Sequence, residues 1–88
     1  MMLKRMEFIA RVNIDEETLE IWLSEQWLLP LHEEDREAFT EADIARARLI
    51  RELEHDFGVN NPGISVVLHL LDQLHSARAS LQKTSPAR

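Results

Sequence analysis

The 88-residue chain has no cysteine, only two glycines and three prolines, and no long apolar run. Without cysteine, a disulfide bridge, a thiol nucleophile and a thiolate metal site are excluded. The few glycines and prolines fall at segment ends, which predicts a mostly helical chain with short connections. Because no apolar stretch has the length of a signal-peptide core or a membrane span, we expect a cytoplasmic protein.

The composition is typical of one small globular domain, with 44% hydrophobic and 30% charged residues. We expect this domain to cover residues 1–83 and a disordered tail to cover residues 84–88. A chain of this length buries a modest share of its surface, so oligomerisation is the expected additional support. The net charge of −6 favours basic partner surfaces and disfavours nucleic acids and anionic lipids.

Apolar spacing predicts two short helices near the N-terminus. The first covers residues 5–12, with Met6, Ile9 and Val12 on one side. The second begins after Asp15, a favourable N-cap followed by two glutamates that suit the positive end of a helix dipole. Its buried stripe is predicted to consist of Leu19, Trp22, Leu23 and Trp27. The two tryptophans suit the core better than the alternative, anchors of an interface.

A small wing and a third helix are predicted next. Residues 28–39 lose the helical period, and HEEDRE is expected as a solvated loop between two short extended pieces. Thr40 is an N-cap with Asp43 three residues on, a variant of the capping box. Gly58 is expected to end the helix in a left-handed conformation. The inward face is predicted to consist of Ile44, Ala47, Ile50, Leu53 and Phe57.

The fourth helix, expected from Asn61 to about Lys83, carries more apolar surface than one core face needs. One stripe consists of Ile64, Val67, Leu68 and Leu71. A second stripe consists of Val66, Leu70, Leu74, Ala77 and Leu81. Two stripes need two partners, so we expect the second to form a dimer interface with the same helix of another copy. The alternative is that both stripes pack inside one monomer around a wide core.

The charge of the segment from Asp15 to Asp43 has the wrong sign for a DNA-reading surface. Residues 15–26 carry five acids and no base, and residues 15–43 carry eleven acids and one base, Arg36. Binding to DNA derives most of its affinity from lysines and arginines that neutralise phosphates. This segment would repel a duplex, and its charge favours a protein as the partner.

Neither a metal site nor a catalytic site is expected. His69, Asp72 and His75 are spaced by three residues, but this spacing drifts around a helix and no fourth ligand is present. We interpret them as a surface strip of ion pairs. Because no nucleophile elbow, phosphate loop or dinucleotide fingerprint is present, we expect neither an enzyme nor a cofactor.

The basic cluster of the third helix has two possible interpretations. Arg46, Arg48 and Arg51 could contact phosphate or the carboxylates of a partner. We prefer local pairing at helical spacing with acids of the same helix, namely Asp43, Glu52 and Glu54.

Three segments carry a family resemblance: WLSEQWLLP at residues 22–30, FTEADIARARLIRELEHDFGV at 39–59 and NPGISVVLHLLDQLHSAR at 61–78. The chain resembles winged helix-turn-helix regulators related to MerR and, among them, the chaperone modulator CbpM family. The resemblance implies a mainly α fold with a small β wing and a long C-terminal dimerisation helix. The very acidic wing departs from typical members.

The resemblance also implies a function. Members of the family bind the J-domain of the DnaJ-like co-chaperone CbpA and block its contact with the Hsp70 protein DnaK. A J-domain presents a basic helix, which an acidic surface suits. We therefore expect J-domain contacts from acids on the resembling segments, namely Glu52, Asp56 and Asp72. The alternatives are a DNA-binding transcription regulator of the MerR type and a bare dimerisation module.

Overall fold

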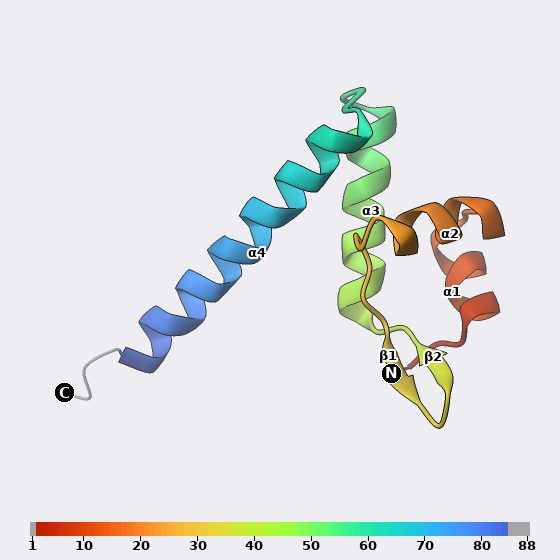
Figure 1. The fold of residues 1–88 in the computed structure, drawn as a ribbon, viewed down its shortest axis with the longest axis horizontal. Helices are drawn as coiled ribbons and strands as arrows, with labels where there is room; N and C mark the ends of the chain where they lie inside the picture. Colours follow the sequence, from red (N-terminus) through yellow and green to blue (C-terminus); the bar gives the residue numbers. More distant parts are fainter. Residues whose placement is uncertain (1, 85–88) are drawn as a thin grey trace.

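The computed structural model describes residues 2–84, and the side chains of residues 2–82. Its helices are α1 (Arg5–Val12), α2 (Glu16–Ser24), α3 (Glu41–His55) and α4 (Asn61–Thr84). Two strands, β1 (Leu31–Glu33) and β2 (Arg36–Ala38), form an antiparallel hairpin between α2 and α3. The first three helices and the hairpin form a compact body, and α4 projects from it (Figure 1). The expected class is confirmed: mainly α, with a small β wing and a long C-terminal helix.

The helix starts follow the predicted capping residues. The Asp15 carboxylate accepts the Thr18 N–H at 2.8 Å, so Asp15 caps α2. The Asp43 carboxylate accepts the Thr40 N–H at 2.9 Å, and the Thr40 hydroxyl accepts the Asp43 N–H at 3.4 Å. These two bonds form a capping box at α3. Gly58 has a φ of 64°, which confirms the left-handed conformation expected there.

The wing differs from the expected solvated loop. Glu33 pairs with Arg36 and Leu31 with Ala38, so most of HEEDRE lies within the strands. Only Glu34 and Asp35 form the turn, with φ values of 50° and 64°. A two-residue turn with both residues at positive φ matches the twist of a hairpin, which is why no longer loop is needed.

The hairpin is fixed to the body by an extended N-terminal residue. Leu3 and Phe39 exchange two backbone hydrogen bonds, of 2.7 and 2.8 Å. The Phe39 ring also stacks on Phe8 of α1, with centroids 4.2 Å apart. The wing therefore keeps a defined position beside α1 and α3.

The core lies between α1, α2, α3 and the first turns of α4. Trp22 and Trp27 are 1% and 2% exposed, which confirms their assignment to the core. The buried cluster consists of Phe8, Val12, Leu19, Trp22, Trp27, Leu28, Phe39, Ile44, Ala47, Ile50, Ile64 and Leu68.

Two predicted core positions are wrong. Met6 is exposed, because α1 turns Phe8 and Val12 inward and Met6 lies about 160° around the helix from Phe8. Phe57 is 74% exposed, because α3 ends at His55 and the helical period does not extend beyond it.

The two apolar stripes of α4 have different environments. Ile64 and Leu68 of the first stripe are buried against the body. The whole second stripe is exposed, so the alternative in which both stripes pack inside one monomer is wrong. Beyond its first turns, α4 leaves the body (Figure 1). The radius of gyration of 15.0 Å accordingly exceeds the value of about 12 Å for a compact domain of this length.

The end of α4 is close to the end expected for the fourth helix. Helix α4 continues to Thr84, one residue beyond the expected limit at Lys83. Residues 85–88 of the expected tail lie outside the described residues. Within residues 2–84, no helix combines the length and the apolarity needed to cross a bilayer.

Candidate functional site

The helix-turn-helix surface of this protein is acidic. Helix α2 follows α1 after a turn of residues 13–15, so it occupies the place of the second helix in a helix-turn-helix unit, which reads the major groove in DNA-binding proteins. Its exposed acids are Glu16, Glu17 and Glu20, and Glu25 follows as its exposed C-cap residue. The wing adds exposed Glu33, Glu34 and Asp35. A surface with these charges is unsuited to phosphate contacts.

The Arg5 side chain of α1 makes a cluster of ion pairs within this acidic surface. Its Nε and Nη2 atoms donate to the two oxygens of Glu37 at 2.7 and 2.8 Å. Its Nη1 atom donates to Glu20 at 2.6 Å and to Glu16 at 3.1 Å. The side-chain hydrogen bonds from Arg5 lower the pKa of Glu37. Because three carboxylates surround one guanidinium, the cluster stays negative.

Sequence reasoning missed the Arg5 cluster. In the sequence, Arg5 is only the first residue of a predicted helix, and Glu37 lies 32 positions further along the chain. A pairing at this separation depends on the hairpin packing beside α1, and no local spacing signals it.

The structure brings two of the three predicted partner contacts together. Glu52 of α3 and Asp56, the C-cap residue of this helix, are exposed one turn apart. They line a shallow groove with Arg48, Arg51 and His55. We refer to this groove as the α3 groove.

The third predicted contact, Asp72, lies elsewhere. Its carboxylate accepts from Nη1 and Nη2 of Arg46 at 2.7 and 3.1 Å. This ion pair lowers the pKa of Asp72. Arg46 precedes Glu52 by six residues, which places it about 120° around α3 from the α3 groove. Asp72 is therefore part of the connection between α3 and α4.

The predicted local pairing of the α3 arginines is wrong for Arg46 and Arg51. Besides its ion pair with Asp72, Arg46 donates through Nε to the carbonyl of Trp27. Arg51 donates to the carbonyl of Val12 at 2.9 Å. Val12 is the last residue of α1, where a helix leaves its carbonyls without partners in the helix. Arg46 and Arg51 therefore both donate to backbone carbonyls of other segments. The third arginine of the cluster, Arg48, is exposed.

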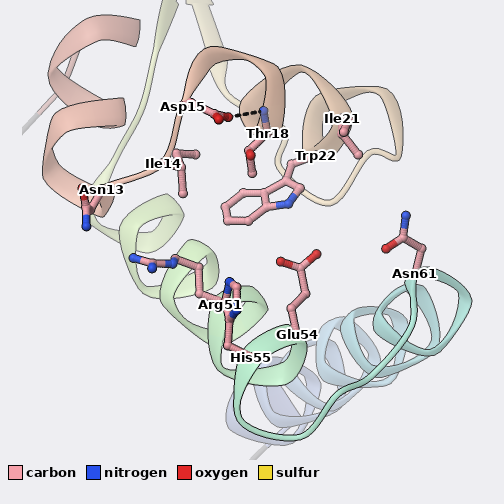
Figure 2. Close-up of a pocket in the computed structure, with 10 residues that line it drawn as sticks. All are labelled: Asn13, Ile14, Asp15, Thr18, Ile21, Trp22, Arg51, Glu54, His55 and Asn61. Atoms are coloured by element: carbon pink, nitrogen blue, oxygen red, sulfur yellow. Dashed lines mark hydrogen bonds between the residues drawn. The ribbon is translucent and has the colours of Figure 1, made fainter.

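A cleft of about 590 Å³ lies between α2 and the C-terminal half of α3 (Figure 2). We refer to it as the α2–α3 cleft. The Glu54 side chain extends from α3 toward Trp22 (Figure 2) and makes no hydrogen bond or ion pair with any described residue. The pairing predicted for Glu54 is therefore also wrong. The lining residues are Asn13, Ile14, Asp15, Thr18, Ile21, Trp22, Arg51, Glu54, His55 and Asn61.

The histidines of α4 form no site with Asp72. His69 and His75 are exposed, and the Asp72 carboxylate is held by Arg46. Within the described part of the chain, no group of three or more histidine or acidic side chains is arranged to hold a metal ion.

The fold can now be compared with known proteins. Residues 3–85 match a family described as "MerR HTH family regulatory protein". No curated protein and no solved structure matches the chain significantly. The family match spans all four helices and the wing, which together form the helix-turn-helix body and the projecting helix. The chain therefore belongs to the MerR HTH family of regulatory proteins.

Proposed function

We propose that this protein is a regulator that acts on another protein. It inhibits a DnaJ-like, CbpA-type co-chaperone by binding the J-domain and blocking its engagement of DnaK. The observation that supports this proposal most strongly is the acidic exposed surface of α2, where a DNA-reading relative needs basic residues.

Charge complementarity supports the choice of partner. A J-domain presents a basic helix, and α2, the wing turn and the α3 groove all expose carboxylates. Complementary surfaces steer association and disfavour wrong partners. Glu52 and Asp56 are the proposed contacts on α3, since both are exposed on the same face. The third proposed contact, Asp72, pairs with Arg46 and lies outside the α3 groove.

Homodimerisation is part of the proposal. The second stripe of α4 leaves Val66, Leu70, Leu74 and Leu81 between 46% and 69% exposed. A contiguous apolar surface of this kind is a liability on a monomer, and pairing with the same stripe of a second copy covers both. We propose that the dimer acts in the cytoplasm, where its co-chaperone partner acts, without a cofactor.

The second candidate is a DNA-binding transcription regulator, which family membership favours. For this candidate, α2 would have to approach phosphates with three exposed glutamates and a fourth, Glu25, at its C-cap. The measurement that separates the candidates is a titration of labelled mixed-sequence and promoter duplexes at low salt. We expect no sequence-dependent binding with a Kd below about 10⁻⁶ M. If binding of that strength is observed, the second candidate is favoured.

Binding to the full-length co-chaperone and to its J-domain tests the first candidate directly. Calorimetry should detect binding that weakens with added salt. The double substitution Glu52→Lys and Asp56→Lys should weaken it by about tenfold or more and flatten its salt dependence. Glu41→Lys, a charge reversal at the other end of α3, is the control and should change affinity by about twofold at most. An unchanged affinity in the double variant would place the contact outside the α3 groove.

A further inference from the structure

We infer that the α2–α3 cleft receives a basic side chain of the partner protein, with Glu54 as its counter-ion. This inference deepens the proposed function and rests on it for the identity of the partner. It concerns a different part of the surface from Glu52 and Asp56, and it follows from the cleft itself.

Glu54 is the unusual group in this cleft. Its side chain is half-buried and directed into the cleft, yet it contacts no donor among the described residues (Figure 2). Its two carboxylate oxygens are acceptors that no described residue uses, so a cation seated in the cleft can pair with them.

The other charged side chains that line the cleft, Arg51 and Asp15, already make hydrogen bonds to backbone groups. Arg51 donates to the Val12 carbonyl, so its guanidinium is held at the end of α1 and away from Glu54. Asp15 uses one carboxylate oxygen to cap α2. Its other oxygen adds negative charge at the same rim of the cleft. The cleft therefore favours a cation over an anion.

The apolar wall suits the stem of a lysine or arginine. Ile14 and Ile21 line the cleft beside Trp22, and Ile21 is 46% exposed. Long basic side chains lay their methylene groups along apolar surface and keep the charged end at a polar group. The volume of about 590 Å³ lies within the range of about 300–1,000 Å³ typical of sites that enclose a ligand.

The position of the cleft fits the same partner as the α3 groove. Arg51 and His55 line both, so the two hollows adjoin along the C-terminal half of α3. A partner helix lying over this ridge can place one basic residue near Glu52 and Asp56 and another beside Glu54. Two acidic subsites on one ridge would also fix the direction of that helix.

The first test needs no J-domain. The full chain, labelled with ¹⁵N, is titrated with N-acetyl-lysine amide and N-acetyl-arginine amide. N-acetyl-norleucine amide is the neutral control, and N-acetyl-glutamate amide is the anionic control. We expect the amide signals of Thr18, Ile21 and Glu54 to shift with the cationic probes only. In Glu54→Gln, which keeps the side-chain shape, these shifts should be lost. Equal shifts with the neutral probe, shifts only with N-acetyl-glutamate amide, or shifts that survive the substitution would overturn the inference.

The second test uses the partner. Glu54→Gln should weaken J-domain binding by about tenfold, and Glu41→Gln on the same helix should leave it unchanged. If the unmodified protein binds and Glu54→Gln binds equally well, the inference is wrong and the proposed function stands. If the unmodified protein does not bind a J-domain, the proposed function is wrong, and the probe titration alone decides whether the cleft accepts a basic side chain.

Discussion

One guanidinium, that of Arg5, joins three segments of the chain. It contacts α2 through Glu16 and Glu20, and β2 through both oxygens of Glu37. The Arg5 and Glu37 side chains are 27% and 23% exposed, so this pair is better shielded from solvent than the bonds to α2. We expect the Arg5–Glu37 pair to provide most of the stabilisation, because exposed ion pairs contribute little.

Replacing Arg5 with methionine should lower the free energy of unfolding by about 1–3 kcal/mol near neutral pH, because it removes a bidentate, charge-assisted contact. Urea unfolding measures the loss. Arg11→Met, at an exposed position of the same helix, is the control and should change stability by about 0.5 kcal/mol at most. If Arg5→Met and Arg11→Met lower the free energy of unfolding equally, the ion pairs of Arg5 do not stabilise the fold.

The effect of Arg5→Met should depend on pH. The folded-state pKa of Glu37 lies below its ordinary value of 4.5, so the pair contributes stability above that value. This contribution is lost as the pH falls from 4.5 through the lowered pKa of Glu37. The difference in unfolding free energy between the two proteins should therefore be largest near neutral pH and shrink over that acidic interval. A difference that is constant with pH would contradict the assignment of the stabilisation to this ion pair.

Helix α3 is the central element of the body, and both of its ends are specified locally. At its start, the Asp43 carboxylate accepts the Thr40 N–H and the Thr40 hydroxyl accepts the Asp43 N–H. Between the ends, Ile44, Ala47 and Ile50 pack into the core. The opposite side presents the α3 groove. One helix therefore holds the core and carries the proposed contacts.

Thr40→Ala should lower the free energy of unfolding by about 1 kcal/mol, because the Asp43 N–H loses its acceptor at the start of α3. Ser76→Ala, at an exposed position in α4, is the matched control and should change it by about 0.5 kcal/mol at most. Both are measured by urea unfolding at constant protein concentration, since a dimer makes stability depend on concentration. A cost for Thr40→Ala no larger than that of the control would contradict the role of the capping box.

The molecule as a whole consists of a compact body and a projecting helix. Arg46 connects the two by its ion pair with Asp72, and the Trp27 indole N–H donates to the Ser65 hydroxyl at 2.9 Å. These contacts, with Ile64 and Leu68, lie in the first half of α4. The later turns of α4 extend away from the body (Figure 1) and present the second apolar stripe.

The substitutions Leu70→Glu and Leu74→Glu should convert a dimer into a monomer, because they place like charges in an apolar interface. Sedimentation velocity measures the change. His69→Glu and Ser76→Glu add the same number of charges on the same helix outside the stripe and should leave the dimer intact. An unmodified protein that sediments as a monomer at all concentrations would refute the proposed dimer.

The sequence by itself determined the helix starts, the capping residues, most of the core and the acidic character of α2. Each of these features depends on residues that lie within one or two helical turns of one another. The spacing of apolar residues, the capping residues and the local charge can therefore be recognised in the sequence itself. Its errors were Met6 and Phe57 in the core, the solvated loop in the wing, and the local pairing of Arg46, Arg51 and Glu54.

Only the tertiary structure decided which distant groups meet. Arg5 finds Glu37, Arg46 finds Asp72, and Arg51 finds the Val12 carbonyl, each across 26 or more residues. Within residues 2–84, it also left Glu54 without a partner in a cleft and the second stripe of α4 without cover. The physical reason is that such contacts depend on how whole helices and strands pack against one another. The sequence places several acids at a suitable spacing from each arginine, and it does not indicate which of them becomes the partner.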